Sequence, residues 1–348
     1  MDQPVFVVGP TRSGTDMMRE LLTRHQSVSI AAETHYFDDI RTTIDSPSTT
    51  RVAAPDARRL EQYFLALTHR SFGHGGEAEK GWMSGADLRK RASELGGTAD
   101  AYFEAYVELV AKDDSVTVLG EMTPRHVFRI DEIIQRYPDA RIVGMMRDPR
   151  AVTASYRDWQ CINGVDLELD PDYAVLLEDE MLRARRSYHP LITATLWRGQ
   201  AGSMLQAREQ HGRAQVKIVS YEALVADPDW GVRDLCDWLG LPFNRDMAEV
   251  ANKESISLRS RRSRGVLRDG AERWRTRLDD TEIALVQSVA RSRMIEAGYR
   301  PERVERNAIG YSKSLASLPF ATARGVRANR DRLGDPIDYF TKRLKSLR

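Results

Sequence analysis

The residues best suited to chemistry stand near the start of the chain, where a short apolar run leads into a turn rich in glycine and hydroxyl groups. The run is Val5 to Val8, and the turn spans Gly9 to Thr15 with the sequence GPTRSGT. Four consecutive apolar residues are typical of a parallel strand buried on both faces. The residues after the turn repeat at helical spacing, with an apolar stripe of Met17, Met18, Leu21 and Leu22. A strand, a turn and a helix N-terminus aim free N–H groups and the positive end of the helix dipole at one point, so this segment predicts a site for a phosphate or sulfate group.

The spacing of the two glycines invites comparison with the nucleotide-binding P-loop, G-x-x-x-x-G-K-[ST]. Gly9 and Gly14 have that spacing, but Thr15 and Asp16 stand where the P-loop has its lysine and its magnesium-binding hydroxyl. An anionic Asp16 there would repel a triphosphate. Arg12 is the strong cation of the turn, and a guanidinium suits bidentate recognition of a tetrahedral oxyanion. The alternative is that the glycines serve a tight turn and that Arg12 is a solvated surface residue.

A second group of candidate residues lies further along the chain, at the end of another apolar run. Residues 141–146 (RIVGMM) favour a buried strand, and Asp148 and Pro149 have the residue types of an N-cap and a first helical residue. Arg147 would then lie at the carboxyl end of the strand and Ser155 on the second turn of the helix. Both side chains can point into the crevice where open α/β sheets bind ligands. The alternative is a helix cap beside a surface arginine.

These two groups of residues resemble the sulfotransferases that use 3′-phosphoadenosine 5′-phosphosulfate (PAPS). The 5′-phosphosulfate loop of that family reads approximately P-x-R-S-G-T, and residues 10–15 (PTRSGT) fit it. The family's 3′-phosphate site is an arginine at a strand end followed by a serine eight residues later, which is the spacing of Arg147 and Ser155. The resemblance implies that the 5′ end is held by Arg12, Ser13, Gly14, Thr15 and Asp16. It also implies PAPS as co-substrate, adenosine 3′,5′-bisphosphate as product, no metal requirement, and a P-loop-like α/β fold with a central parallel sheet flanked by helices.

Two weaker matches extend the resemblance. Residues 216–222 (VKIVSYE) favour a further strand, and the segment that starts at Tyr221 (YEALVADP) is similar to the family's Y-E-x-L-x-x-D-P, whose tyrosine lies by the nucleotide. Residues 264–274 (RGVLRDGAERW) are a basic stretch like the loop that closes the family's 3′-phosphate pocket, so Arg268 and Gly270 are candidates there. The alternatives are core packing for the tyrosine and a solvated loop for the basic stretch.

A base for the reaction is expected from the segment after the second strand. Residues 28–32 (VSIAA) favour that strand, and Glu33 follows it. By the resemblance, sulfuryl transfer is an in-line displacement in which a base removes the proton of the acceptor hydroxyl. Glu33 follows Arg12 at a spacing similar to that of the glutamate base in tyrosylprotein sulfotransferases. His35 competes for the role, because many sulfotransferases use a histidine, and it shares the face of Glu33 if the strand continues; the alternative for Glu33 is a cap of the next helix.

One departure from the family pattern concerns a lysine that often approaches the transferring sulfuryl group. It belongs to an E-K-[TS]-P segment at the end of the next strand, which is expected here at 116–120, with EMTP after it. Met122 therefore stands where the lysine would be and cannot supply its charge. Either Arg12 alone neutralises the leaving group, or Arg125 reaches it from the following turn, with His126 as a further polar candidate.

Composition and charge narrow the classes of function. The 348 residues carry 52 basic and 51 acidic side chains, a formal net charge of +1, which implies no bulk polyanion partner such as nucleic acid. Two cysteines are too few for a zinc site. No apolar run reaches membrane-spanning length, and the strand that begins near Pro4 leaves no room for a signal peptide. We therefore expect a cytoplasmic, bacterial enzyme, and the question of an oligomer stays open.

The chain is expected to form a single α/β domain over residues 1–300. Residues 38–115 separate the second and third strands, and their helical spacing predicts a helical insertion that serves as a lid beside the acceptor site. Residues 301–348 are basic and weakly amphipathic, which is typical of a docked helix rather than a membrane anchor.

The sequence therefore predicts a sulfotransferase that moves the sulfuryl group of PAPS to a hydroxyl of a small metabolite, sugar or phenol, with Glu33 as general base. A small-molecule kinase of the P-loop class is the main alternative. A second alternative is a nucleotide-binding protein without catalytic activity. No motif identifies the acceptor.

Overall fold

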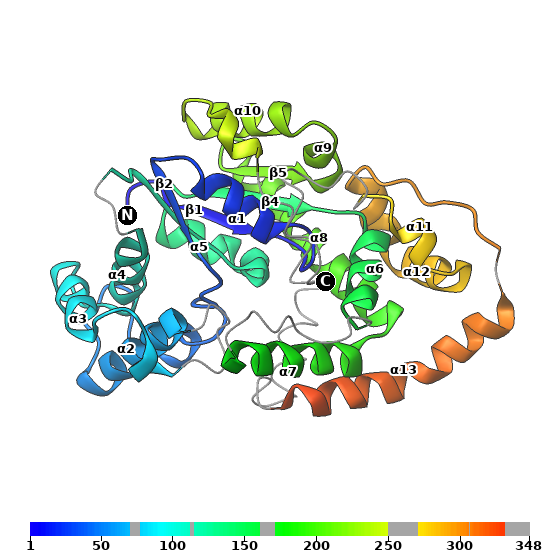
Figure 1. Ribbon diagram of the computed structural model, residues 1–348, viewed down its shortest axis with the longest axis horizontal. Helices are drawn as coiled ribbons and strands as arrows, with labels where there is room; N and C mark the ends of the chain where they lie inside the picture. Colours follow the sequence, from blue (N-terminus) through cyan, green and yellow to red (C-terminus); the bar gives the residue numbers. More distant parts are fainter. Residues whose placement is uncertain (70–76, 112–114, 161–170, 250–270, 306, 331–348) are drawn as a thin grey trace.

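The computed structural model describes residues 1–69, 77–111, 115–160, 171–249, 271–305 and 307–330, without the side chains of 158–160, 171–177 and 180. Its centre is a five-stranded sheet in the order β2-β3-β1-β4-β5, in which all neighbours pair in parallel (Figure 1). The strands are β1 (Val5–Val8), β2 (Val28–Ala31), β3 (Val118–Met122), β4 (Arg141–Met146) and β5 (Val216–Ser220). The expected parallel α/β sheet is confirmed.

Helices flank the sheet, and short 3-10 turns lie between several of these elements. The α-helices are α1 (Thr15–Thr23), α2 (Ala54–His69), α3 (Gly85–Glu94), α4 (Ala99–Ala111), α5 (Ile130–Arg136), α6 (Pro149–Gln160), α7 (Pro171–Ser187), α8 (Pro190–His211), α9 (Tyr221–Ala226), α10 (Pro228–Leu239), α11 (Trp274–Arg277), α12 (Asp280–Glu296) and α13 (Ala308–Ala328). The 3-10 turns are η1 (Arg41–Thr43), η2 (Ala78–Lys80), η3 (Pro124–Phe128) and η4 (Arg245–Ala248).

Alternate residues of β1 belong to two hydrophobic cores, one on each face of the sheet. Val5 and Val7 pack in the core that includes α1, α9 and α10. Phe6 and Val8 pack in the core that includes α4, α5 and α8. The four residues of β1 are all apolar because both faces of the strand are buried. The turn after β1 therefore starts from a strand that is fixed on both faces.

The order of the strands creates a switch point at β1. β3 lies on one side of β1 and β4 on the other, so the chain passes from one side to the other between them. The register pairs Val7 with Met122 and Val8 with Gly144, so the carboxyl ends of these three strands reach the same edge of the sheet. Open α/β sheets bind ligands in the crevice beyond such a point.

Three strands have bounds that differ from those that the sequence predicted, and the first of them, β2, ends at Ala31 rather than at residue 32. β3 runs from Val118 to Met122 rather than over 116–120, because its pairing with β1 on one side and β2 on the other continues to Met122 and Glu121. β5 ends at Ser220 rather than at 222, because the Ser220 hydroxyl accepts a hydrogen bond from Ala223 N and starts α9.

The predicted helical insertion between β2 and β3 is confirmed in its described part, which contains η1, α2, η2, α3 and α4. It packs against the segment after β2 through aromatic rings. Tyr36 stacks on Phe103 of α4 with ring centroids 4.8 Å apart, and Phe37 contacts Phe6 of β1 edge-on at 6.1 Å. The segment that carries Glu33 is therefore placed between the sheet and the insertion.

The described part of the C-terminal region forms α13, which lies along α7 (Figure 1). Arg183 of α7 donates to Ala328 O at 3.0 Å, and Asn329 donates to the Ser187 hydroxyl at 2.9 Å. Residues 331–348 lie outside the described residues. None of the helices in the described ranges combines the length and the apolar character that crossing a membrane requires.

Candidate active site

The turn after β1 has a backbone that requires glycine at two points. Gly9 has φ 149°, and a Cβ there would clash with Met145 O of the neighbouring strand. Gly14 has φ 91°, and a Cβ there would lie 2.7 Å from the ring of Tyr221. Gly14 is also the N-cap of α1, and it has no side chain to cap the helix. The first N–H groups of α1 are therefore available to an external anion.

The polar side chains of the turn point in different directions. Ser13 is fully buried, and its Oγ has no hydrogen-bond partner among the described residues. A buried hydroxyl without a partner is unfavourable, and an anion at the helix N-terminus would accept its hydrogen bond. The Asp16 side chain is 62% exposed and pairs with Arg19 at 3.2 Å. Asp16 can therefore contribute its backbone N–H to an anion, but not its side chain.

Arg12, Arg147 and Ser155 lie together although they are far apart in the sequence. Arg12 Nε donates to Ser155 Oγ at 3.2 Å, and Arg147 Nη1 donates to Arg12 O at 3.0 Å. Arg12 has a left-handed backbone (φ 70°), which is strained for a residue other than glycine. Burial is the main cause that lowers the pKa of Arg12, and the nearby charge of Arg147 acts in the same direction. Two guanidinium groups held this close favour an anionic ligand.

Tyr221 packs in the hydrophobic core and also contacts the group formed by Arg12, Arg147 and Ser155. Its ring is buried beside Gly14, in the core that includes α1. The guanidinium carbon of Arg147 lies 4.1 Å from the centroid of the same ring. Core packing and contact with the candidate nucleotide site, which the sequence left as alternatives, therefore occur together.

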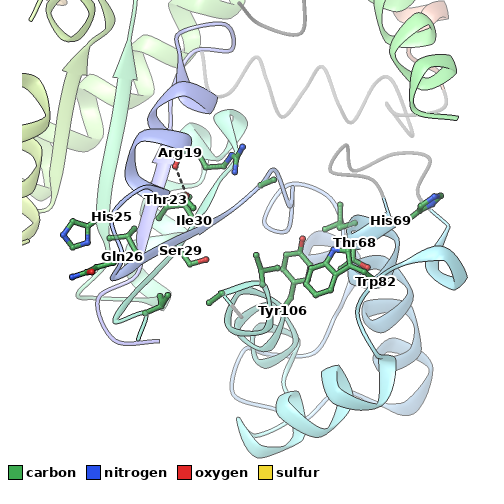
Figure 2. A pocket seen from close by; sticks show the side chains of 16 residues that line it. Arg19, Thr23, His25, Gln26, Ser29, Ile30, Thr68, His69, Trp82 and Tyr106 are labelled. Carbon is green, nitrogen blue, oxygen red and sulfur yellow. Dashed lines mark hydrogen bonds between the residues drawn. The ribbon is translucent and has the colours of Figure 1, made fainter. Parts of the chain in front are cut away.

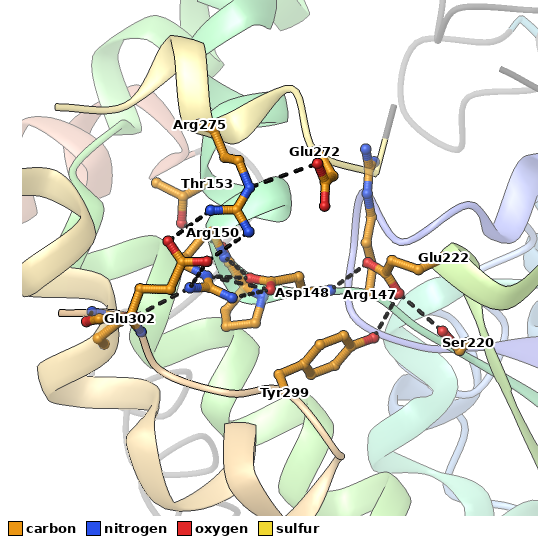
Figure 3. Close-up of polar contacts among 12 residues, drawn as sticks. Arg147, Asp148, Arg150, Thr153, Ser220, Glu222, Glu272, Arg275, Tyr299 and Glu302 are labelled. Atoms are coloured by element: carbon orange, nitrogen blue, oxygen red, sulfur yellow. Dashed lines mark hydrogen bonds and ion pairs between the residues drawn. The ribbon is translucent and has the colours of Figure 1, made fainter. Parts of the chain in front are cut away.

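Glu222 holds the backbone next to Arg147 (Figure 3). Its carboxylate accepts hydrogen bonds from Asp148 N at 2.9 Å, from the Tyr299 hydroxyl at 2.9 Å and from the Ser220 hydroxyl at 3.0 Å. The only signal for it in the sequence is its place in the Y-E segment. Because three groups from different elements donate to one carboxylate, the backbone next to Arg147 is held in a single position.

Asp148 and Arg150 form a second support for the same loop. Asp148 Oδ1 accepts from Arg150 N at 2.8 Å, the N-terminal capping contact that the sequence predicted. The Arg150 guanidinium also pairs with Asp148 at 2.6 Å and lies 4.0 Å from the ring centroid of Trp274. Trp197 Nε1 donates to Arg147 O at 2.8 Å. The carboxyl end of β4 is thus rigid where Arg147 leaves it.

Glu33 and His35 form a pair at the end of β2. Glu33 Oε2 lies 3.0 Å from His35 Nε2. The strand ends at Ala31 and His35 has φ 51°, so the two side chains meet across a turn rather than along a continuing strand. Burial disfavours the charged form of His35, but the hydrogen bond and charge of Glu33 outweigh it and raise the pKa of His35. The charge of Glu33 also acts on Arg12, so the pair lies within electrostatic reach of the turn after β1.

At about pH 6, His35→Asn is expected to lower the free energy of unfolding by about 2 kcal/mol, because it removes a charge-assisted hydrogen bond to Glu33. Asparagine tolerates the left-handed backbone, so the turn itself is kept. The pKa of His35 is raised on folding, so the stabilisation is complete below the ordinary value of 6.5 and disappears as the pH rises through the folded value. Urea unfolding of both proteins across this pH range measures the effect. An equal loss of stability at every pH would show that the imidazolium does not pair with Glu33.

A fully buried carboxylate ties the turn after β2 to β3. Glu121 accepts hydrogen bonds from Thr34 Oγ1 at 2.9 Å and from Thr34 N at 3.1 Å. It also contacts the Thr123 hydroxyl and His126 Nδ1. Burial opposes the ionisation of Glu121, but His126 and these donors outweigh it and lower the pKa of Glu121. In the sequence, Glu121 stands out only as the glutamate of the EMTP segment, which is similar to the family's E-K-[TS]-P.

The segment that offers substitutes for the family lysine contacts the turn after β1, because Gly9 N donates to Pro124 O at 3.2 Å. Met122 alternates with Glu121 on β3 and is buried in the core on the α1 side. Arg125 lies 3.8 Å from Asp38 and 4.0 Å from Asp39. His126 is fully buried against Glu121. Arg12 and Arg147 meet at the turn, whereas Arg125 and His126 pair with acidic side chains.

A cavity of about 580 Å³ lies beside this site rather than within it (Figure 2). It runs along the outer edge of β2, between α1 and the helical insertion. Its lining includes Arg19, Ser29, His69, Trp82 and Tyr106. Neither the glycine turn nor Arg147 lines it, so this cavity is not the anion site.

Arg268 and Gly270 belong to 250–270, which lies outside the described residues. Within the described ranges, no group of three or more histidine, cysteine or acidic side chains is arranged to hold a metal ion.

Comparison with known proteins places the chain in a family. The model of the sulfotransferase family matches residues 4–245. Nodulation protein NoeE of Sinorhizobium fredii is 25% identical over 305 residues, which are 84% of this chain but only 65% of that protein. The solved structure of the sulfotransferase domain from the curacin biosynthetic pathway has a TM-score of 0.52 at 15% identity, over 87% of this chain and 99% of that chain, which shows a shared fold. The matched residues contain the glycine turn and all five strands of the P-loop-like sheet, and the chain belongs to the sulfotransferase family.

Proposed function

We propose that this chain transfers the sulfuryl group of PAPS to a hydroxyl group of an acceptor molecule. The observation that carries the proposal is the meeting of Arg12, Arg147 and Ser155 at the N-terminus of α1. PAPS has anionic groups at two positions of its ribose, a phosphosulfate on the 5′ oxygen and a phosphate on the 3′ oxygen. The guanidinium groups of Arg12 and Arg147 and the nearby helix N-terminus supply positive charge for both.

The residues divide naturally between the two ends of the nucleotide. The 5′-phosphosulfate is assigned to the N–H groups at the start of α1, the buried Ser13 hydroxyl and Arg12, because these groups surround the turn. The 3′-phosphate is assigned to Arg147 and Ser155, with Tyr221 beneath the guanidinium of Arg147. Arg12 donates to Ser155 directly, so nucleotide binding must replace that contact with contacts to phosphate oxygens.

The proposed reaction is an in-line displacement at sulfur. The acceptor oxygen forms a bond to sulfur, the bond from sulfur to the bridging oxygen breaks, and adenosine 3′,5′-bisphosphate leaves with the electron pair. Glu33 accepts the proton of the acceptor hydroxyl, and His35 orients its carboxylate. Arg12 and the N–H groups of α1 stabilise the charge on the sulfuryl oxygens and the leaving group. Because Met122 carries no charge, Arg12 supplies more of this stabilisation than in relatives with a lysine at that position.

The acceptor is assigned to the space between Glu33 and the helical insertion. Tyr63 of α2 donates to Thr34 O at 2.5 Å, so the insertion contacts the segment that carries the proposed base. A lid made of the insertion would exclude water from the reacting groups. The acceptor class proposed is a hydroxyl of a small metabolite, a sugar or a phenol.

Titration calorimetry with adenosine 3′,5′-bisphosphate and, in the presence of Mg²⁺, with ATP tests the nucleotide assignment. We expect the bisphosphate to bind about 30-fold more tightly, because only it has a 3′-phosphate for Arg147 and Ser155, and such a contact is worth about 2 kcal/mol. Asp16, in the position of the P-loop hydroxyl, gives ATP no magnesium-binding partner of the usual kind. Tight ATP binding without bisphosphate binding would favour a kinase and refute the proposal.

A further inference from the structure

The peptide group of Thr34 is held from two sides by residues that take no part in the reaction above. Its N–H lies 3.1 Å from Glu121 Oε1 and 3.1 Å from Thr123 Oγ1. Its C=O accepts a hydrogen bond from the Tyr63 hydroxyl at 2.5 Å. The Thr34 hydroxyl donates to Glu121 and accepts from Tyr36 N at 3.3 Å. Every polar group of this residue is therefore bonded.

The same contacts account for the unusual backbone of the next residue. His35 has φ 51°, a left-handed conformation that is uncommon for residues other than glycine. Its N–H donates to Thr123 Oγ1 at 3.2 Å. The N–H groups of Thr34 and His35 therefore both donate to polar side chains at the carboxyl end of β3. Because of this conformation, the His35 ring reaches Glu33 at 3.0 Å.

We propose that Glu121 and Tyr63 are positioning residues, which hold the Thr34 peptide from opposite sides and so fix the turn that presents the Glu33–His35 pair to the acceptor. The inference rests on the proposed function, in which Glu33 is the base. Glu121 is fully buried on a strand with neighbours on both sides, so it holds the turn to the sheet. Tyr63 belongs to α2, so it holds the same turn to the insertion. A change in either would move the base relative to the bound sulfuryl group, and misplacement of a catalytic group lowers the rate of the chemical step.

Tyr63→Phe removes one oxygen and keeps the ring in its packing. We expect kcat to fall about tenfold, with the KM for PAPS and the affinity for adenosine 3′,5′-bisphosphate within about twofold of the wild type. Tyr106→Phe is the matched control, because Tyr106 is a buried tyrosine of the same insertion whose hydroxyl makes no hydrogen bond to a described residue. An unchanged kcat in Tyr63→Phe would overturn the inference.

A double-mutant cycle that combines Tyr63→Phe with Glu33→Gln tests whether Tyr63 acts by positioning Glu33. If Tyr63 acts through Glu33, the loss caused by Tyr63→Phe disappears when Glu33 is already glutamine. Losses that multiply would show that Tyr63 acts independently of Glu33 and would overturn the inference. Full activity of Glu33→Gln alone would instead remove the base from the proposed function, so the two failures are distinguishable.

Hydrogen exchange of the backbone amides of residues 32–37 tests the same inference without an acceptor. We expect exchange about tenfold faster in Tyr63→Phe and Glu121→Gln than in the wild type, and unchanged in Tyr106→Phe. Unchanged exchange in Tyr63→Phe would show that its hydroxyl does not hold the turn. Should Glu121→Gln not fold, Tyr63→Phe decides the result, since it removes a single partly buried hydroxyl.

Discussion

Glu33→Gln is expected to reduce turnover by about 100-fold or more and to leave the affinity for adenosine 3′,5′-bisphosphate within about twofold of the wild type. Glutamine keeps the size of the side chain and its contact with His35, but it cannot accept the proton of the acceptor hydroxyl. Glu33 bonds to His35 rather than to Arg147 or Ser155, so the nucleotide contacts are unchanged. Single-turnover rates with saturating PAPS measure the chemical step, and calorimetry measures the affinity.

Glu20→Gln is the matched control for this substitution. Glu20 is a carboxylate on α1, beyond the first turn of the helix and paired with Arg19 at 3.8 Å. We expect the turnover of Glu20→Gln to stay within about twofold of the wild type, because glutamine keeps the size of this partly buried side chain and Glu20 takes no part in the proposed reaction. Full activity of Glu33→Gln would assign the base to another residue, with His35 as the first candidate. A loss of bisphosphate affinity comparable with the loss of turnover would assign Glu33 to the binding of the nucleotide instead.

Arg147→Ala is expected to weaken the binding of adenosine 3′,5′-bisphosphate by about 30-fold, which corresponds to about 2 kcal/mol. The substitution removes the guanidinium assigned to the 3′-phosphate and with it the hydrogen bond to Arg12 O. The effect should fall on the nucleotide affinity and the KM for PAPS, whereas kcat at saturating PAPS should change much less. Titration calorimetry of both proteins measures it, and ATP, which lacks the 3′-phosphate, should lose little affinity.

Arg141→Ala controls for the loss of an arginine from the same strand. Arg141 begins β4, at the opposite end from Arg147, and lies 5.3 Å from the ring centroid of Trp238. Arg141 is too far along the strand to reach a ligand at the carboxyl edge of the sheet. The affinity of Arg141→Ala for the bisphosphate should therefore equal that of the wild type. Equal affinities for Arg147→Ala and the wild type would remove Arg147 from the 3′-phosphate site.

The parts of the site that the sequence predicted are local in the chain. The strand, turn and helix over residues 5–23 follow from an apolar run, two glycines at fixed spacing and one apolar stripe, all within a few residues of each other. The cap at Asp148 and the helix after it were predicted in the same way. Such features depend on backbone preferences and periodicity, which a sequence displays directly.

The parts that could not be predicted depend on distant contacts. Arg12 and Ser155 meet because β1 and β4 are neighbours, and only the order of the strands shows this. The role of Glu121 was not predicted, because its place in the EMTP segment does not show that it is buried against Thr34. Its hydroxyl and backbone partners at Thr34 come from a different strand. β2 ends at Ala31 and does not continue to His35, since the contacts to the end of β3 bend the chain there.

Transfer of radioactive sulfur from labelled PAPS to a panel of sugars, phenols and small hydroxyl-bearing metabolites, with a chelator present, tests the proposed function most directly. With the wild-type chain we expect a labelled acceptor, release of one adenosine 3′,5′-bisphosphate for each sulfuryl group transferred, and loss of both signals in Glu33→Gln. Transfer of the terminal phosphate of ATP in the presence of Mg²⁺, with no transfer from PAPS to any acceptor, would contradict the proposal and identify the chain as a kinase.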